Sequence, residues 1–181
     1  MLSFGTSLID SRRLVRDVGI ADGMRVADFG CGRSAHLILP AAQAVGESGR
    51  VYAVDLVRAH LESLENLCSM HGVCNMTPVW GDFERLGGVA IAPSSLDLIF
   101  FVNNMALQPS LPALADEIRR LLKDSGRVVV VDWKKRFPHP VAPPRNSLYD
   151  LHDAELAFTR HGFNKIDEVP VSNTHWGMVL I

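Results

Sequence analysis

Short runs of valine, isoleucine and other apolar residues alternate along the chain with longer segments in which apolar residues recur every three or four positions. The short runs are typical of β-strands, and the longer segments are typical of amphipathic helices. This alternation predicts an α/β fold in which helices cross over between parallel strands. The predicted strands are residues 25–29, 50–55, 76–80, 96–102, 127–133, 165–172 and 175–181. The predicted helices are residues 7–18, 34–45, 56–70, 111–123 and 153–160.

Three segments give further detail of the predicted sheet. Residues 96–102 (LDLIFFV) are almost wholly apolar, as expected for a strand at the centre of a sheet that is covered on both faces. The last two strands are separated only by a turn at Asn173 and Thr174, so they must pair antiparallel. Residues 137–144 hold four of the ten prolines and are interpreted as a surface connection. We therefore expect one domain, with an N-terminal helical segment (1–22) and a sheet core (23–181).

The composition narrows the class of protein. The chain has 181 residues, of which 48% are hydrophobic and 21% are charged, which is ordinary for a globular domain. Three cysteines, an odd number, argue against a secreted disulfide framework. A net charge of −2 lacks the positive field that binding to nucleic acid or an anionic membrane requires. With no signal-peptide pattern and no apolar run of about 18 residues, we expect a soluble cytoplasmic protein.

The strongest motif is the segment DFGCGRS, residues 28–34, between the first predicted strand and the following helix. Its glycines allow a ligand to approach the backbone at the carboxyl end of a parallel strand. Gly30, Gly32 and Ala35 also fit the dinucleotide fingerprint G-x-G-x-x-G/A, and Asp55 follows at the end of the second strand. A carboxylate there accepts hydrogen bonds from ribose hydroxyls of any adenosine cofactor. The loop alone therefore leaves NAD and S-adenosylmethionine both open.

Two further acids favour one of these cofactors. Asp28 places a negative charge where a dinucleotide would bring its pyrophosphate, which disfavours that ligand. The same carboxylate suits a cofactor with an ammonium and a sulfonium group. Asp82, just after the third strand, is positioned to accept a hydrogen bond from an adenine amino group, with Phe83 packing on the ring. Three acids at three successive strand ends fit S-adenosylmethionine better than a nicotinamide dinucleotide.

On these motifs the sequence resembles the class I S-adenosylmethionine-dependent methyltransferases. Within them it is similar to the small methyltransferases related to ubiquinone and menaquinone biosynthesis (methyltransferase type 11). The resemblance extends from about residue 14 to the C-terminus, through GMRVADFGCGRS, GRVYAVDL, VWGDFERL, SLDLIFFVNNMAL, LLKDSGRVVVVDWKK and DAELAFTRHGF. It implies a single methyltransferase domain with a Rossmann-like, doubly wound, seven-stranded sheet that is mostly parallel and has an antiparallel C-terminal strand.

The resemblance also implies the residues that bind the cofactor. The implied contacts are Asp28, Gly30, Cys31 and Gly32 with the methionine moiety, Asp55 and Leu56 with the ribose, Asp82 and Phe83 with the adenine, and Asn103 with the methionine end. Ser34 replaces a third loop glycine, and its hydroxyl is expected to cap the helix and to contact the cofactor.

Some family features are absent from this sequence. Residues 104–107 contain no histidine where close relatives often have one, so no catalytic residue is assigned. No insertion precedes the last two strands, so residues 1–10 are the expected lid over the substrate. No metal is expected, because Cys68, His71 and Cys74 fall short of the four ligands of a structural zinc site.

The functional hypothesis is methyl transfer from S-adenosylmethionine to an unidentified acceptor, with a small molecule favoured over nucleic acid. Two alternatives stay open: a non-catalytic partner subunit that keeps the fold, and an NAD-dependent oxidoreductase. Asp132 and Trp133 follow the fifth strand, and His175 and Trp176 lie on the last one. At this point these four residues are interpreted equally well as core or as the wall of a substrate pocket.

Overall fold

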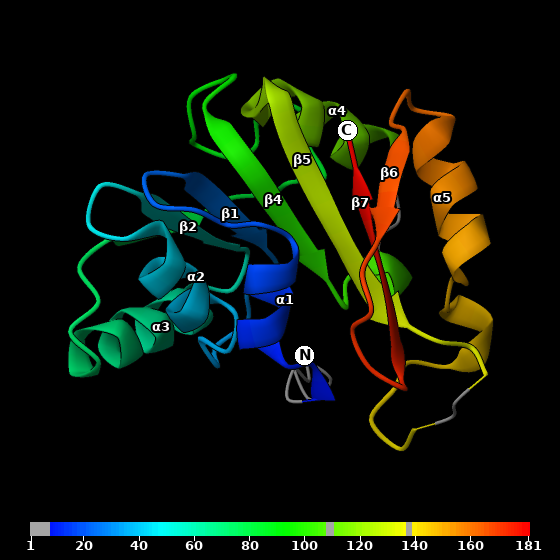
Figure 1. The fold of residues 1–181 in the computed structure, drawn as a ribbon, viewed down its shortest axis with the longest axis horizontal. Helices are drawn as coiled ribbons and strands as arrows, with labels where there is room; N and C mark the ends of the chain where they lie inside the picture. The colour runs from blue at the N-terminus through cyan, green and yellow to red at the C-terminus, as the bar shows by residue number, and fades with distance from the viewer. Residues whose placement is uncertain (1–7, 108–110, 137–138) are drawn as a thin grey trace.

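The structure is a computed structural model that describes residues 8–107, 111–136 and 139–181 (Figure 1). One sheet of seven strands has the order β3-β2-β1-β4-β5-β7-β6. The strands are β1 (Arg25–Phe29), β2 (Arg50–Asp55), β3 (Met76–Trp80), β4 (Leu96–Val102), β5 (Leu122–Trp133), β6 (Lys165–Glu168) and β7 (His175–Leu180). The α-helices are α1 (Ser11–Asp17), α2 (Ile38–Val45), α3 (Arg58–Met70), α4 (Leu111–Leu121) and α5 (Leu151–Thr159).

The strand directions confirm the predicted α/β topology. The pairs β1–β2, β1–β4, β2–β3 and β4–β5 are parallel, whereas β7 is antiparallel to both β5 and β6. The strand β4 has three strands on each side, so the apolar run LDLIFFV does lie at the centre of the sheet. The carboxyl ends of the parallel strands meet at one edge, where open α/β sheets bind ligands.

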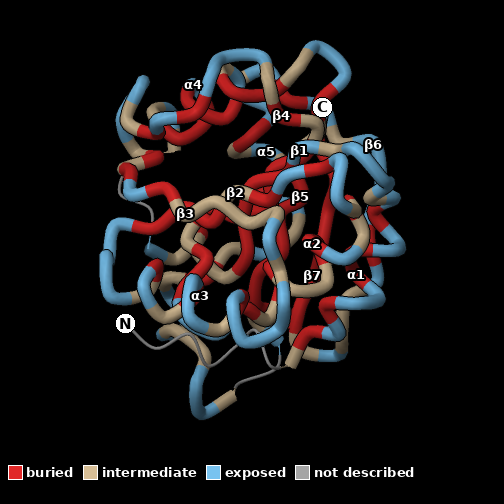
Figure 2. Tube along the Cα trace, turned by 90° about the vertical axis from the view of Figure 1, so that its left-hand side faces the viewer, coloured by how far each residue is buried: buried red, intermediate tan, exposed pale blue. Residues whose placement is uncertain are grey.

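Helices cover both faces of the sheet and form two hydrophobic cores. Helices α1, α2 and α3 pack on one face, and α4 and α5 pack on the other (Figure 1). Successive β5 residues alternate between the cores: Val129 and Val131 belong to the first, Val128 and Val130 to the second. In Figure 2 the buried segments run through the sheet between the helices, while exposed residues lie on the outside. This two-sided burial explains why the central strands are almost continuously apolar.

The observed helices differ from the predictions mainly at their first residues. The prediction that α2 begins at residue 34 is wrong, because Ala35 has φ +51° and α2 begins at Ile38. The α2 N-cap is Leu37, without a side-chain hydrogen bond, so the expectation that Ser34 caps this helix is also wrong. Helix α1 begins at Ser11, because the Asp10 side chain accepts a hydrogen bond from the backbone N–H of Arg13.

The terminal hairpin is shorter than predicted, since β6 ends at Glu168. Among the described residues, no helix is long and apolar enough to span a membrane.

Candidate active site

The glycine loop joins β1 to α2 and lies against β2 and β4. Gly30 and Gly32 have φ angles of +73° and +62°, a backbone conformation that favours glycine. The backbone N–H groups of Gly30 and Cys31 both donate to the carbonyl oxygen of Val54, at 2.9 and 3.2 Å. A Cβ atom on Gly30 would overlap the side-chain amide of Asn104. The loop is therefore held tightly at the carboxyl end of the sheet by Val54 and Asn104.

Asp55, at the end of β2, fixes the loop from the neighbouring strand. Its Oδ2 atom accepts a hydrogen bond from the backbone N–H of Gly32 at 3.0 Å, and its Oδ1 atom accepts one from Val57 at 2.8 Å. His60, in the first turn of α3, places Nδ1 3.2 Å from Oδ2. Because each carboxylate oxygen has about two acceptor positions, Oδ1 keeps one for a further donor such as a ribose hydroxyl.

Asp28 is a buried carboxyl group beside the same loop. Burial, and secondarily the negative charge of Asp55, raises the pKa of Asp28 to about 7. The Cys31 thiol is also buried, and burial together with the charges of Asp28 and Asp55 raises its pKa. Cys31 therefore stays protonated and is not an activated nucleophile. A cation near Asp28 would favour the ionised carboxylate, whereas a phosphate would oppose it.

The segment after β3 separates the predicted pair Asp82 and Phe83. Asp82 is half-buried, and its Oδ1 atom accepts a hydrogen bond from the backbone N–H of Glu84 at 2.9 Å. The ring of Phe83 is buried in the core, where it stacks on Phe29 with ring centroids 5.1 Å apart. The structure thus places this ring in the hydrophobic core on the face of the sheet that α4 and α5 cover. That it contacts an adenine ring stays a prediction.

A different aromatic residue is exposed at this end of the sheet. Trp80, at the end of β3, is 52% exposed, and its Nε1 donates to the carbonyl oxygen of Leu56 at 2.9 Å. Leu56 is itself 48% exposed, and the Arg58 guanidinium lies 4.4 Å from the centroid of the Trp80 ring. Leu56 and Trp80 therefore offer an open apolar surface next to Asp55. The sequence reasoning assigned a role to Leu56 but overlooked Trp80.

Two consecutive asparagines follow β4 and have different environments. Asn103 has φ +58°, and its buried Nδ2 and Oδ1 atoms have no hydrogen-bond partner in the described part of the chain. Asn104 instead donates from Nδ2 to the carbonyl oxygens of Phe29 and Val102, both at 2.9 Å. Asn103 is thus free to bind a ligand, while Asn104 joins β4 to the start of the glycine loop. Sequence reasoning did not assign this role to Asn104.

Two buried carboxylates hold the neighbouring loops. Asp132 accepts hydrogen bonds from the backbone N–H groups of Met105 (2.9 Å) and Trp133 (2.7 Å), while burial raises its pKa to about 6. Glu117 on α4 accepts hydrogen bonds from the backbone N–H groups of Gly87 (2.7 Å) and Val89 (3.0 Å), in the loop that contains Asp82. Arg120 bonds both carboxylate oxygens of Glu117. Sequence patterns did not identify these roles.

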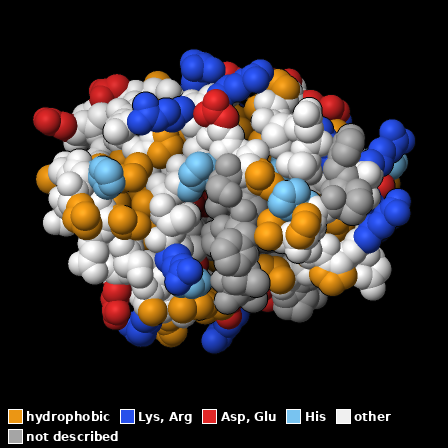
Figure 3. Space-filling model, turned by 90° about the horizontal axis from the view of Figure 1, so that it is seen from below, with side chains coloured by type: hydrophobic (Ala, Val, Ile, Leu, Met, Phe, Trp, Pro, Cys, Tyr) orange, Lys and Arg blue, Asp and Glu red, His pale blue; other side chains and the backbone are white. Residues whose placement is uncertain are grey.

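The predicted residues thus fall into two groups. Asp28, Gly30, Cys31, Gly32, Asp55 and Asn103 lie together at the ends of β1, β2 and β4, with Leu56 and Asp82 at the adjoining ends of β2 and β3. Ser34 lies farther along the loop and lines a separate cavity of about 360 Å³, next to Ile9 and His36. Figure 3 shows the molecule from below, and the lysine and arginine side chains (blue) lie mostly toward the rim of this face.

This donor set fits S-adenosylmethionine. The buried Asp28 suits a cation, and Asn103 has unpartnered donor and acceptor atoms. A dinucleotide fits less well, because its pyrophosphate would approach the charge of Asp28. Within the described residues, no group of three or more His, Cys, Asp or Glu side chains is arranged to hold a metal ion.

Comparisons with known proteins agree with this geometry. Residues 20–165 match a family model described as a methyltransferase domain. Nocamycin O-methyltransferase of Saccharothrix syringae is 31% identical over 74% of this chain and 44% of its own length. Demethylmenaquinone methyltransferase of Staphylococcus aureus is 26% identical over 84% of this chain and 59% of its own length. The chain thus spans about half the length of these relatives.

A solved structure of a methyltransferase from Aquifex aeolicus, described as SAM-dependent, superposes with a TM-score of 0.86 at 22% identity. The match covers 99% of this chain and 93% of the other. At this identity the superposition shows the shared fold, and the family rests on the sequence matches. The chain belongs to the methyltransferase-domain family.

Proposed function

We propose that this chain transfers the methyl group of S-adenosylmethionine to a small-molecule acceptor with a planar, oxygen-substituted ring. The observation that supports it most is the buried Asp28 beside the glycine loop, flanked by Asp55 and the unpartnered Asn103. The relatives named for nocamycin O-methylation and demethylmenaquinone methylation support a small, ring-containing acceptor. A net charge of −2 offers no positive field for a nucleic acid.

In this proposal, residues at the ends of different strands bind different parts of the cofactor. Asp28 would pair with the ammonium group of the methionine moiety, and the free position on Asp55 Oδ1 would accept a ribose hydroxyl. Asp82 would accept from the adenine amino group, while Leu56 and Trp80 present apolar surface beside it. Asn103 would bind the methionine end through its unpartnered amide.

S-adenosylmethionine supplies a methyl group that is activated by a positively charged sulfur, and transfer leaves S-adenosylhomocysteine. The protein's part is therefore mainly to fix the orientation of the reactants, an effect that supplies roughly 7–11 kcal/mol in favourable cases. The backbone bonds of Gly30, Gly32 and Asn103 serve this purpose, because they fix the loops on which the binding groups lie.

Titration calorimetry with S-adenosylhomocysteine and with NAD tests the proposed cofactor. We expect micromolar binding of the first ligand, no binding of NAD, and loss of the first ligand's binding in Asp55→Ala. Asp116→Ala, which changes an exposed acid on α4, is the matched control. Failure of the folded wild-type protein to bind S-adenosylhomocysteine would overturn the proposal, and NAD binding would favour the oxidoreductase alternative.

A second assay separates an enzyme from a non-catalytic partner subunit. Labelled S-adenosylmethionine is incubated with a panel of phenols, quinols and hydroxylated polyketides, and transfer of label to the organic phase is measured. We expect transfer to at least one class of ring. Cofactor binding without transfer to any member of the panel would favour the partner-subunit alternative.

A further inference from the structure

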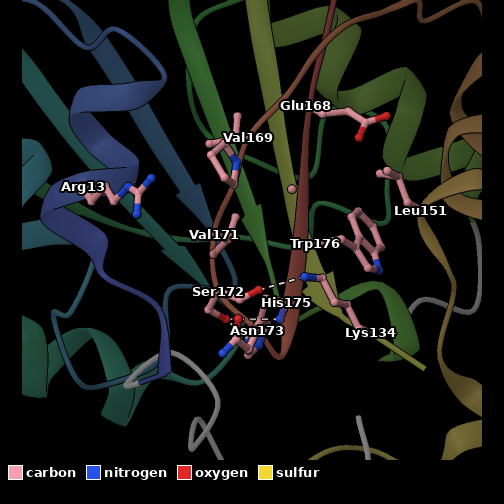
Figure 4. Close-up of a pocket in the computed structure, with 12 residues that line it drawn as sticks. Arg13, Lys134, Leu151, Glu168, Val169, Val171, Ser172, Asn173, His175 and Trp176 are labelled. Atoms are coloured by element: carbon pink, nitrogen blue, oxygen red, sulfur yellow. Dashed lines mark hydrogen bonds between the residues drawn. The ribbon is translucent and has the colours of Figure 1, made fainter. Parts of the chain in front are cut away.

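The loop that joins β3 to β4, residues 81–95, carries Asp82 and packs against α4. It begins at the β3 edge of the sheet, whereas the cavity of about 560 Å³ beside the terminal hairpin lies at the opposite edge, next to β6 and β7 (Figure 4). Within the described part of the chain, no residue of this loop lines that cavity. The contacts of the β3–β4 loop thus concern the Asp82 end of the site and not the hairpin cavity.

The fully buried Glu117, on α4, fixes the β3–β4 loop through its backbone. The Glu117 carboxylate accepts hydrogen bonds from the N–H groups of Gly87 at 2.7 Å and Val89 at 3.0 Å. The carbonyl oxygen of Gly88 belongs to the same peptide group as the Val89 N–H, and it accepts a hydrogen bond from the N–H of Asp82 at 3.1 Å. One peptide group therefore connects the Glu117 carboxylate to the backbone of Asp82.

Arg120, one turn later on α4, orients the Glu117 carboxylate. Its Nε and one terminal nitrogen donate to the two carboxylate oxygens, at 2.8 and 2.6 Å. The same guanidinium donates to the carbonyl oxygens of Val89 at 2.9 Å and Ile91 at 3.2 Å. Because such paired contacts to a planar guanidinium define its orientation, Glu117 and Arg120 together hold the N–H and the carbonyl groups of the loop.

Close backbone packing transmits this position to Asp82. A Cβ atom on Gly88 would overlap the carbonyl oxygen of Asp82, and a Cβ atom on Gly81 would lie 2.8 Å from the carbonyl oxygen of Gly88. The two parts of the loop thus pack backbone against backbone. On its other side, Asp82 is followed by Phe83, whose ring stacks on Phe29 at the end of β1 with centroids 5.1 Å apart. Asp82 therefore has fixed neighbours in both directions.

The side chain of Asp82 leaves one oxygen for a ligand. Its Oδ1 atom accepts a hydrogen bond from the N–H of Glu84 at 2.9 Å, and no residue in the described ranges hydrogen-bonds its Oδ2 atom. A carboxylate oxygen accepts a hydrogen bond from the 6-amino group of adenine, whereas the 6-oxo group of hypoxanthine offers only a second acceptor. A fixed Asp82 carboxylate therefore distinguishes these two bases.

We propose that Glu117 is a positioning residue for adenine recognition. Through Arg120 and the Gly88–Val89 peptide group it fixes Asp82, so that the cofactor site selects a 6-aminopurine over a 6-oxopurine. The proposal rests on the proposed methyltransferase function, because Asp82 receives the adenine only there. Glu117 lies on α4 and acts through the loop, without a contact of its own to the cofactor.

The test compares S-adenosylhomocysteine with S-inosylhomocysteine, which has an oxygen in place of the 6-amino group. Both ligands are titrated into the full chain by calorimetry, and the measured quantity is the ratio of their two dissociation constants. A smaller folded fraction weakens both affinities by the same factor and leaves this ratio unchanged. Displacement of Asp82 changes the ratio, so the measurement separates positioning from stability.

We expect the wild type to bind S-adenosylhomocysteine about tenfold or more tightly than S-inosylhomocysteine, and Asp82→Ala to lose most of this preference. Glu117→Gln keeps the length of the side chain but loses its charge and one acceptor oxygen. It should reduce the preference by about threefold or more, and Glu117→Ala by at least as much.

Two neighbours on α4 supply matched controls. Asp116→Asn removes the same charge at an exposed position, and Ile118→Ala opens a cavity at a fully buried one. Both should keep the ratio within about twofold of wild type, since neither side chain hydrogen-bonds the β3–β4 loop among the described residues. Thermal denaturation confirms that each variant is folded at the assay temperature.

A reduced ratio in Glu117→Gln, with an unchanged ratio in both controls, supports the positioning role. An unchanged ratio in Glu117→Gln, an equal reduction in Ile118→Ala, or no preference in a wild type that binds S-adenosylhomocysteine would overturn it. Failure of the wild type to bind S-adenosylhomocysteine would instead contradict the proposed function.

Discussion

The side-chain nitrogen of Asn104 lies 2.9 Å from the carbonyl oxygen of Phe29, which is 75 positions earlier in the chain. This hydrogen bond joins the end of β4 to the point where β1 passes into the glycine loop. Gly30 leaves room for it, because a Cβ atom at that position would overlap the Asn104 amide. The first loop glycine therefore serves two purposes: it adopts a positive φ angle, and it admits the side chain that fixes the loop.

Replacing Gly30 should destabilise the fold more than replacing a glycine that is required only for its positive φ angle. Gly72 has φ +67°, close to the +73° of Gly30, and a Cβ on Gly72 would meet nothing within 4 Å. Gly72→Ala should cost about 1–2 kcal/mol, the usual penalty for a left-handed alanine. Gly30→Ala should cost more, because it also displaces Asn104. Urea unfolding of the two variants measures the difference, and equal losses would contradict the steric argument.

The coupling between Gly30 and Asn104 can be measured with a double-mutant cycle. Asn104→Ala alone should cost about 1–3 kcal/mol, because it leaves the carbonyl oxygens of the buried residues Phe29 and Val102 without this donor. In the double variant, part of the Gly30→Ala penalty should disappear, since the displaced side chain is gone. Asn66→Ala, at an exposed site on α3, is the control and should be neutral. Strictly additive losses would show that the two residues do not interact.

The strands could be predicted from the sequence because their apolar runs reflect burial on both faces. The run RVADF coincides with β1 and LDLIFFV with β4, both as predicted. The start of α2 could not be predicted, because periodicity does not reveal that Ala35 adopts a left-handed conformation. Ala35 is fully buried in the core, and local propensity does not record such tertiary packing.

The candidate site was predictable where its residues follow strand ends in a known spacing, as Asp28 and Asp55 do. The residues that support it were not, because their contacts join distant segments. Asn104 and Asp132 make hydrogen bonds to positions 75 and 27 residues away, and no local pattern records such a contact. His60 was within reach of sequence reasoning, since it lies five positions after Asp55 at the start of the next helix.

His60 should affect cofactor affinity more than stability. Its Nδ1 atom lies 3.2 Å from Asp55 Oδ2 and helps to orient that carboxylate. His60→Phe should weaken binding of S-adenosylhomocysteine by about three- to tenfold, while the free energy of unfolding changes by about 1 kcal/mol or less. His71→Phe, at the exposed end of the same helix, should change neither. Unaltered affinity in His60→Phe would show that Gly32 and Val57 orient Asp55 sufficiently.

Glu117 should be a major source of stability, although it lies outside the proposed site. It is fully buried and accepts hydrogen bonds from Arg120 and from the backbone of Gly87 and Val89. Burial alone would raise the pKa of Glu117, but these hydrogen bonds outweigh it, so the pKa is lowered. Glu117→Ala should therefore cost about 3–5 kcal/mol, since it removes the carboxylate that pairs with Arg120 and leaves the N–H groups of Gly87 and Val89 without an acceptor.

Urea unfolding as a function of pH checks this account of Glu117. A carboxylate with a lowered pKa stabilises the fold above its unfolded pKa, and this stability is lost as the pH falls. The difference between wild type and Glu117→Ala should accordingly shrink on acidification below about pH 5. The exposed neighbour supplies the control, because Asp116→Ala should stay within about 0.5 kcal/mol of wild type. A difference that grows on acidification would contradict the assigned direction of the pKa shift.

Asp28 should have the opposite pH dependence, because its pKa is raised to about 7 by burial and by Asp55. Its neutral form is favoured in the folded protein, so its contribution is complete below its unfolded pKa of about 4 and is lost as the pH rises to about 7. At about 1.4 kcal/mol per pKa unit, the loss amounts to roughly 4 kcal/mol at most. Asp28→Asn removes this titration, so its stability relative to wild type should increase between pH 4 and 7 and then level off.

Binding of the cofactor should remove the proton from the Asp28 carboxyl group. An ammonium group beside Asp28 favours the ionised carboxylate, so binding of S-adenosylhomocysteine below pH 7 should release a proton. The affinity should therefore fall by up to about tenfold for each unit by which the pH is lowered. Calorimetry at pH 6 in two buffers of different ionisation enthalpy counts the protons released. Wild type should release close to one, and Asp28→Asn should release none that depends on this residue. Equal proton release by both proteins would show that Asp28 does not face the charged end of the cofactor.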